Sequence, residues 1–214
     1  TIDSCSTPCS NKKTFNNTDI WDKAYLDIID NLTPDALSIY NKIPKISPPI
    51  NCSSETKKEL EDVKLKQKNI TQEQQQQINN ELTLNHIYTI FQATKCEQNE
   101  INKLMENYLA PIILKLKHDY GRVRPYYLDK CIKPTAPKPK HAAYPSGHAT
   151  QAHFIAELFS QKYPSKTAVY YSLATRVATN RERAGVHYKS DSHYGRKVGE
   201  TIAKHVNLDD FLNC

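Results

Sequence analysis

The chain has 214 residues, a length that suits one domain, and its mean hydropathy of −0.68 is that of a polar globular protein. The net charge of +6 favours anionic partners, although a solvated lysine-rich surface explains the bulk charge equally well. Neither a nucleic-acid-binding arm nor a zinc-finger spacing is present, so nucleic acid is not an expected partner. No stretch approaches the ~20 apolar residues that span a bilayer, so we expect a soluble or peripheral protein without a transmembrane segment.

Helical patterns fill the first half of the chain, where glycine is absent. The spacing predicts a helix over residues 20–32, behind an N-cap at Thr18 or Asp19, and a second over 34–43 that Pro34 opens. A proline-rich break covers residues 44–49. Further helices are expected over 55–69 and 74–91, with the run of glutamines at 74–77 forming a solvated face of the latter.

The second half continues in the same way, with few alternating strand patterns. Three prolines make residues 126–144 an expected loop. Helices are predicted over 99–118, 148–161, 166–179 and 187–205. We therefore expect an all-α fold, a compact helical bundle in one domain over residues 1–214. Its motif-bearing catalytic half would span 99–205 and its helical N-terminal half 18–98.

Six cysteines are widely spaced and include no C-x-x-C pair: Cys5, Cys9, Cys52, Cys96, Cys131 and Cys214. Metal clusters need ligands closer together, so we expect disulfides, three if all pair, with free cytosolic thiols as the alternative. Thr1 at the start fits a removed signal peptide but equally a trimmed chain. Four N-x-S/T sequons favour export only weakly, because about two would arise by chance. They begin at Asn16, Asn31, Asn51 and Asn69. A secreted, lumenal or otherwise extracytoplasmic location is expected.

Three polar clusters in the second half carry the candidate chemistry. The first, residues 117–125, has the pattern K-x6-R-P, and the second, residues 144–148, reads Y-P-S-G-H. The third, residues 181–191, has the pattern R-x5-H-x3-D. Alone, each has an ordinary explanation: a basic helix end, a turn, and a surface His–Asp pair. Together they supply three cations, two histidines, one carboxylate and a turn that opens a helix, a combination that chance rarely produces.

Phosphoryl transfer requires this set of groups. Arginine and lysine hold the charged oxygens of the transferring group, and backbone N–H groups at a Ser-Gly turn before a helix form an anion nest. His187 and Asp191 are four residues apart, so on a helix they would share a face and hydrogen-bond, which fits a nucleophile with its orienting carboxylate. His148 can protonate the leaving oxygen. No carboxylate cluster of the kind that holds paired metal ions accompanies the motifs, so no metal is expected.

The three clusters resemble the signature of the type 2 phosphatidic acid phosphatase superfamily. That superfamily includes bacterial class A nonspecific acid phosphatases, membrane lipid phosphatases and vanadium haloperoxidases. The resemblance covers about residues 117–191, and the sequence Y-P-S-G-H-A-T at 144–150 is especially similar to the soluble acid phosphatases.

The resemblance implies a role for each motif residue. His187 would be the nucleophile, Asp191 its orienting partner, and His148 the general acid and later the base. The phosphate oxygens would be bound by Lys117, Arg124, Ser146, Gly147 and Arg181. The reaction would be metal-independent hydrolysis of phosphate monoesters through a phosphohistidine, without a cofactor and with vanadate as an inhibitor.

One residue departs from the family pattern, because Asn180 stands where a serine usually precedes the third-cluster arginine. We expect the chemistry to be unaffected, with a change in how Arg181 is held. Three alternatives stay open: a lipid phosphate or diphosphate substrate, vanadate-dependent halide oxidation, and non-catalytic anion binding. Neither the particular ester nor the oligomeric state follows from the sequence. No role is assigned to the six remaining histidines, which are His86, His118, His141, His153, His193 and His205.

Overall fold

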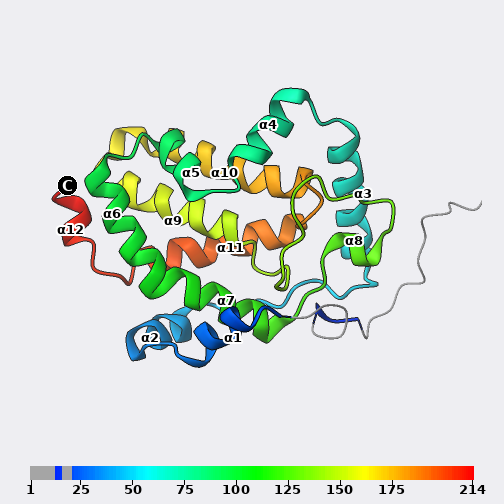
Figure 1. Ribbon diagram of the computed structural model, residues 1–214, viewed down its shortest axis with the longest axis horizontal. Coiled ribbons are helices and arrows are strands. Elements are labelled where there is room, and N and C mark those ends of the chain that lie inside the picture. Colours follow the sequence, from blue (N-terminus) through cyan, green and yellow to red (C-terminus); the bar gives the residue numbers. More distant parts are fainter. Residues whose placement is uncertain (1–12, 16–20) are drawn as a thin grey trace, which may run out of the picture.

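The computed structural model describes residues 13–15 and 21–214, and these contain helices and no strand, which confirms the all-α prediction. Figure 1 shows three long helices, α9, α10 and α11, running side by side through the centre. In chain order the elements are α1 (Lys23–Asp30), α2 (Pro34–Lys42), α3 (Ser54–Lys68), α4 (Gln72–Asn80), α5 (Leu84–Phe91), α6 (Lys95–Leu104), the π-helical η2 (Met105–Leu109), α7 (Ala110–Tyr120), α8 (Pro125–Leu128), α9 (Gly147–Lys162), the 3-10 helix η3 (Pro164–Lys166), α10 (Thr167–Arg183), α11 (Lys189–Ala203) and α12 (Asp209–Leu212).

The first predicted helix begins later than expected. Its N-cap is Asp22, whose carboxylate accepts a hydrogen bond from the Ala24 N–H, because an acidic side chain at this position satisfies a free N–H of the first turn. The expected caps Thr18 and Asp19 lie outside the described residues. The prediction for α2 is confirmed, with Pro34 at its first position and Thr33 as its cap.

The helix predicted over residues 74–91 is wrong in one respect, since the chain forms two helices there, α4 and α5. Glu81 ends α4 and Thr83, in an extended conformation, precedes α5. The Glu81 side chain is fully buried and accepts a hydrogen bond from Asn180 Nδ2 at 2.9 Å. A buried carboxylate needs such partners, and this turn brings it to them.

The predicted helix over residues 99–118 corresponds to α6, η2 and α7 in succession. Pro111 lacks an N–H and cannot continue the regular ladder. The Ala110 N–H bonds instead to the Met105 carbonyl, five residues back, which makes the intervening turn π-helical. The one-turn helix α8 stands at the start of the segment predicted as a loop, and residues 129–146 form the irregular connection to α9.

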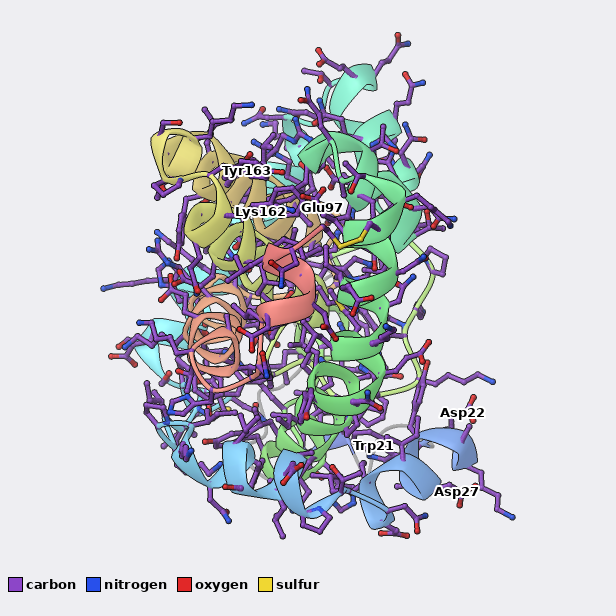
Figure 2. All side chains as sticks on the ribbon, turned by 90° about the vertical axis from the view of Figure 1, so that its left-hand side faces the viewer. Trp21, Asp22, Asp27, Glu97, Lys162 and Tyr163 are labelled. Carbon is purple, nitrogen blue, oxygen red and sulfur yellow. A yellow bond between two sulfur atoms is a disulfide. The ribbon has the colours of Figure 1, made fainter. Side chains whose placement is uncertain are left out.

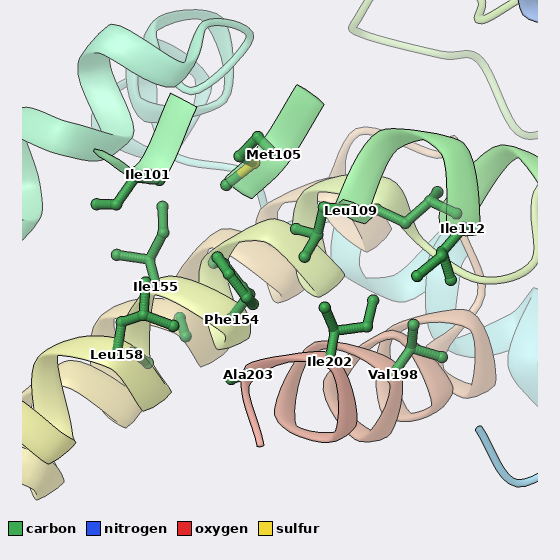
Figure 3. Packing of buried hydrophobic residues seen from close by; sticks show 14 of the residues in the cluster. Ile101, Met105, Leu109, Ile112, Phe154, Ile155, Leu158, Val198, Ile202 and Ala203 are labelled. Atoms are coloured by element: carbon green, nitrogen blue, oxygen red, sulfur yellow. The ribbon is translucent and has the colours of Figure 1, made fainter. Parts of the chain in front are cut away.

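The core lies between α7, α9 and α11. Buried Leu109 and Ile112 face Phe154 of α9 and Ile202 of α11 (Figure 3). At Gly199, helix α11 approaches helix α9 so closely that a Cβ atom on this residue would lie 2.5 Å from the carbonyl oxygen of Thr150. This glycine is needed for the close contact between the later part of α11 and the first turns of α9, which keeps the helices that follow the third and second clusters together.

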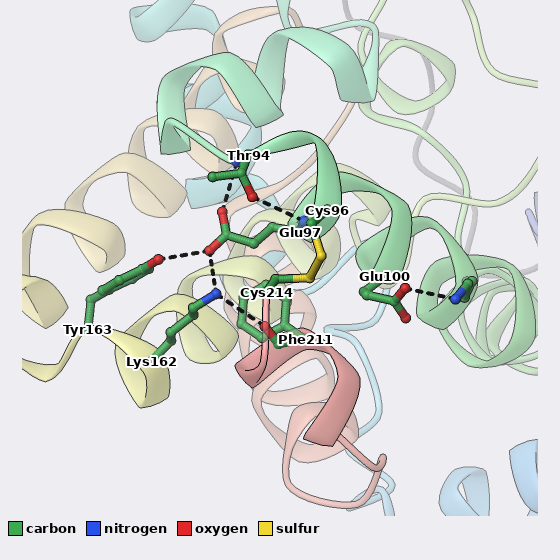
Figure 4. Close-up of a disulfide and its surroundings, with 9 residues drawn as sticks. Thr94, Cys96, Glu97, Glu100, Lys162, Tyr163, Phe211 and Cys214 are labelled. Carbon is green, nitrogen blue, oxygen red and sulfur yellow. Dashed lines mark hydrogen bonds and ion pairs between the residues drawn. A yellow bond between two sulfur atoms is a disulfide. The ribbon is translucent and has the colours of Figure 1, made fainter.

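The C-terminal segment is fastened to α6 by the disulfide Cys96–Cys214 (Figure 4). Beside it, buried Glu97 forms an ion pair with Lys162 Nζ at 2.8 Å and accepts a hydrogen bond from the Tyr163 hydroxyl at 2.9 Å. Figure 2 shows this group far from Trp21 and α1. The segment is thus held both covalently and by a buried ion pair.

The disulfide prediction is supported in the described part of the chain. Cys52 and Cys131 are disulfide-bonded in addition to Cys96 and Cys214, and no described cysteine is free. Cys5 and Cys9 lie outside the described residues. No helix in residues 21–214 is long and apolar enough to cross a membrane.

The sequons differ in their surroundings. Asn31 and Asn69 are exposed at the C-caps of α1 and α3. Asn51 is buried, and its amide donates to the Lys13 carbonyl oxygen at 2.7 Å. Asn16 lies outside the described residues. Of the three described sequon asparagines, Asn31 and Asn69 therefore have the exposure that a glycosylation acceptor needs, and Asn51 does not.

Candidate active site

The three clusters meet around one cavity of about 270 Å³. Five of the eight predicted site residues line this cavity, and they come from the end of α7, the start of α9, the end of α10 and the segment before α11: Lys117, Gly147, His148, Arg181 and His187. The other three, Arg124, Ser146 and Asp191, are fully buried and contact them. The structure therefore brings together all eight residues, although they lie up to 74 positions apart in the sequence.

His187 is held between a carboxylate and a guanidinium. Its Nδ1 lies 3.0 Å from Asp191 Oδ2 and its Nε2 lies 3.0 Å from Arg124 Nη1. A guanidinium can only donate, so Nε2 is the acceptor and Nδ1 carries the hydrogen that is donated to Asp191. Burial, and then the cations Arg124 and Lys117, keep the pKa of His187 well below its usual range. The imidazole is thus neutral, with its lone pair on Nε2.

The His187–Asp191 contact is confirmed, but the reason predicted for it is wrong. The two residues do not share a helical face, because His187 precedes α11, which starts at Lys189. Asp191 lies in the first turn of that helix and accepts a hydrogen bond from the Tyr188 N–H at 3.0 Å. The same carboxylate therefore caps the helix and orients the histidine.

Arg124 is buried in a shell of carbonyl oxygens. Nη1 donates to the Val186 oxygen at 2.7 Å, and Nη2 donates to the oxygens of His141 and Ala142 at 3.0 and 3.1 Å. Burial lowers the pKa of Arg124 to about 10. These bonds fix the plane of the guanidinium beside the nucleophile candidate, His187.

Lys117 is held in the same manner by the loop that precedes α9. Its Nζ donates to the carbonyl oxygens of Ala142 and Pro145, at 2.8 and 2.5 Å. Burial and the nearby charge of Arg124 hold the pKa of Lys117 well below its ordinary value. The negative charge of a bound anion would favour the protonated form.

The Ser-Gly-His turn opens α9 as predicted. Ser146 is the N-cap, and its hydroxyl oxygen accepts a hydrogen bond from the Ala149 N–H at 3.5 Å. Its own N–H donates to the Asp191 carbonyl oxygen at 3.0 Å, which ties the second cluster to the third. The next two residues, Gly147 and His148, line the cavity. Burial, and then Arg181, lower the pKa of His148 to about 3.

Arg181 is positioned by a network that includes Asn180. Arg181 Nη2 donates to the Ile78 carbonyl oxygen at 2.9 Å and lies 3.5 Å from Glu81 Oε2. The same Glu81 oxygen accepts from Asn180 Nδ2 at 2.9 Å. Asn180 and Arg181 thus share one buried carboxylate, so the residue that departs from the family pattern contributes to holding the arginine.

Sequence analysis missed four residues around the site. His141 lines the cavity and its Nδ1 lies 3.1 Å from Arg124 Nη2. Arg122 contacts Asp191. It stands inside the first cluster, two residues before the motif arginine Arg124, and this second arginine was a signal that sequence analysis could have used. Glu59 and Glu81 come from the N-terminal half, and no local pattern distinguishes them from surface carboxylates.

The cavity is suited to an oxyanion. Two cations and three histidines reach its wall, and none of the described residues that line it is a carboxylate. In the part of the chain that the structure describes, no three His, Cys, Asp or Glu side chains are grouped to hold a metal ion. The fold and the site together define the class: in the described residues, a helical bundle with an oxyanion-suited cavity where helix ends converge.

The comparison with known families agrees with this class. The profile described as "PAP2 superfamily" matches residues 104–211. The chain therefore belongs to the PAP2 superfamily. A search of curated protein sequences found no significant match.

Solved structures that share the fold include a phosphatase and a haloperoxidase. One is a transmembrane PAP2-type phosphatidylglycerolphosphate phosphatase from Bacillus subtilis, with a TM-score of 0.54 and 15% identity over 84% of this chain and 92% of that one. The other is a bacterial vanadium-dependent iodoperoxidase, with a TM-score of 0.53 and 14% identity over 76% of this chain and 52% of that one. This chain thus spans about half the length of the iodoperoxidase. At such low identity these likenesses establish the fold only.

Proposed function

We propose that this protein is a metal-independent phosphatase that hydrolyses phosphate monoesters through a phosphohistidine at His187. The observation that carries the proposal is the line Asp191–His187–Arg124. It fixes a neutral imidazole with its Nε2 lone pair at the cavity wall, beside a cation that can hold a phosphate oxygen.

In the first step, the Arg124 Nη1–H that is donated to Nε2 of His187 turns to a phosphate oxygen. The freed Nε2 lone pair then attacks phosphorus while the bond to the ester oxygen breaks. The leaving oxygen takes a proton, and the imidazolium that forms is stabilised by the Asp191 carboxylate at Nδ1. In the second step a water attacks the phosphorus of the phosphohistidine and gives up a proton while the bond from phosphorus to Nε2 breaks. This step releases inorganic phosphate and restores the neutral imidazole. Lys117, Arg124 and Arg181 would hold the equatorial oxygens throughout.

His148 is the residue proposed to deliver and remove that proton. It lines the cavity with His187, so a bound phosphoryl group would lie near both. In the ligand-free protein its pKa of about 3 leaves it neutral at most pH values. The negative charge of a bound phosphate would offset the nearby cations, and a monoanionic substrate would bring the missing proton with it.

Activity is expected to be highest on the acid side of neutrality. A phosphate monoester loses its second proton near pH ~6, and above that pH neither the substrate nor His148 carries a proton. The kcat/KM for an alkyl phosphate should therefore fall about tenfold per pH unit above that point. His187, with its lowered pKa, stays nucleophilic in mild acid. A profile that rises from pH 6 to pH 8 would contradict this assignment.

A panel of phosphate esters tests the function itself. Sugar, nucleotide, aryl and alkyl phosphates should be assayed after exhaustive chelation, and full activity is expected without added metal. Loss of all activity that one divalent ion restores would overturn the mechanism. The panel should also include alkyl chains of increasing length.

A lipid phosphate is the second candidate substrate, and one observation favours it. Apart from the motif residues, the cavity wall is mainly apolar: Leu82, Ile113, Leu114, Ala136, Pro137 and Val186. Each buried CH₂ group contributes about 0.8 kcal/mol, so a rise in kcat/KM with every added CH₂ would identify this class. A flat series would support small esters.

Two further proposals accompany the function. Vanadate should inhibit, since its five-coordinate form resembles the phosphoryl-transfer transition state.

We also propose an extracytoplasmic location, because disulfides persist in oxidising compartments. The disulfide Cys96–Cys214 and the absence of a free described cysteine support this location.

A further inference from the structure

Both oxygens of Asp191 are occupied, and by different partners. Oδ2 accepts from His187 Nδ1 and from the Tyr188 N–H, both at 3.0 Å. Oδ1 accepts from Arg122 Nη1 at 2.6 Å. Asp191 is fully buried, and a buried carboxylate is costly without a cation. Among the described residues, Arg122 is the cation that contacts it.

Arg122 is itself fixed on three sides. Its Nη1 also donates to Ser190 Oγ at 2.7 Å, and its Nη2 donates to Glu59 Oε2 at 2.9 Å. The guanidinium lies over the Tyr188 ring, with its central carbon 3.8 Å from the ring centroid. The Arg122 side chain is 2% exposed, so it has one arrangement and cannot swing away from Asp191.

Glu59 extends this network to α3, in the half of the chain without motifs. Its Oε1 accepts from the Ser190 N–H at 2.6 Å, at the first turn of α11. Glu59 therefore holds both Arg122 and the helix end that carries Asp191. A carboxylate at a helix N-terminus is also favoured by the helix dipole.

In the order Glu59–Arg122–Asp191–His187, the cation Arg122 stands between two carboxylates, and the second carboxylate contacts the neutral imidazole. Although burial lowers the pKa of Arg122, the carboxylates of Asp191 and Glu59 raise it above the ordinary arginine value, so the guanidinium is charged. None of the three contacts between these four residues needs a ligand, so the arrangement is complete before substrate binds. Preorganisation of this kind keeps a nucleophile in its productive tautomer.

We propose that Arg122 is a positioning residue that holds Asp191 for His187, and that Glu59 in turn orients Arg122. This inference rests on the proposed function, in which His187 is the nucleophile. Arg124 contacts the cavity-lining His187, whereas Arg122 neither lines the cavity nor donates to a side chain that lines it. Arg122 therefore acts on the reaction through Asp191 and not on the phosphate.

The test compares Arg122→Gln, Arg122→Lys and Glu59→Gln with a matched control, Lys162→Gln. The control breaks the buried Glu97–Lys162 ion pair outside the cavity. For Arg122→Gln we expect kcat to fall about 10- to 100-fold with KM within about threefold. Arg122→Lys should recover part of this loss, and Glu59→Gln should lower kcat by about 3- to 10-fold. The control should lower Tm while leaving kcat unchanged.

A spectroscopic readout separates positioning from stability. In protein with ¹⁵N-labelled histidine, His187 should give an Nδ1–H signal, identified by its absence in His187→Asn. Arg122→Gln should add the Nε2–H form, and Lys162→Gln should not. If Arg122→Gln matched the control in kcat and in spectrum, the inference would be wrong.

Two other outcomes are also decisive. If Arg122→Gln does not fold, Arg122→Lys and Glu59→Gln carry the same comparison, and unchanged kcat and spectra in both would overturn the inference. If the wild-type protein hydrolyses no ester, the proposed function fails. The tautomer spectra then still decide whether Arg122 orients the Asp191–His187 pair.

Discussion

His187→Ala is expected to abolish turnover of every phosphate ester, whereas His148→Ala should affect esters according to their leaving groups. The first variant removes the Nε2 atom that attacks phosphorus, and no described residue can replace it in the Asp191–Arg124 line. The His148→Ala variant leaves that line intact and removes only the side chain that donates a proton to the departing oxygen. General acid catalysis contributes about 10²–10⁴-fold. Alkyl phosphates should lose that much and activated aryl phosphates far less.

The His148 variant should also accumulate phosphoenzyme, because the same residue is proposed to activate the hydrolytic water. Acid-quenched label should map to His187. His205→Ala is the matched control, since that histidine is exposed just beyond the end of α11 and its ring contacts the Thr201 carbonyl oxygen of that helix. This variant should retain full activity. Label on His148, or equal losses in both variants on both ester types, would refute the assignment.

Removal of the Cys96–Cys214 disulfide should cost about 5 kcal/mol of unfolding free energy. The bond links residues 118 positions apart, and in the chain-entropy account a cross-link over about 100 residues restricts the unfolded chain by nearly that amount. Urea unfolding of Cys96→Ser/Cys214→Ser against the wild type measures the difference.

The same double variant should keep its kcat/KM within about twofold at temperatures where it is folded. The bond lies beside α12 (Figure 4), and neither cysteine lines the cavity. A loss of less than about 1 kcal/mol would mean that the Glu97–Lys162 ion pair and the burial of Phe211 hold the segment without the cross-link.

Local patterns predicted much of the fold. Pro34 marks the start of α2 in the sequence, and the Ser146–Gly147 turn marks the start of α9. These signals suffice because proline at the first position and a side-chain acceptor at the N-cap act within one turn. The break at Glu81 could not be predicted in this way. It depends on Asn180, 99 positions away.

For the site, the sequence by itself determined which residue types gather: the cations, the two histidines and the carboxylate at motif spacing. It also indicated that His187 and Asp191 would touch, although through the wrong local geometry. Only the tertiary structure decided what holds them. Glu59 reaches Arg122 and Ser190 from 63 and 131 positions away, and Glu81 reaches Arg181 from 100 positions away. The physical reason is that a buried charge requires a partner from whichever element packs beside it. Which residue becomes that partner is decided by the packing of the helices and not by the spacing of residues along the chain.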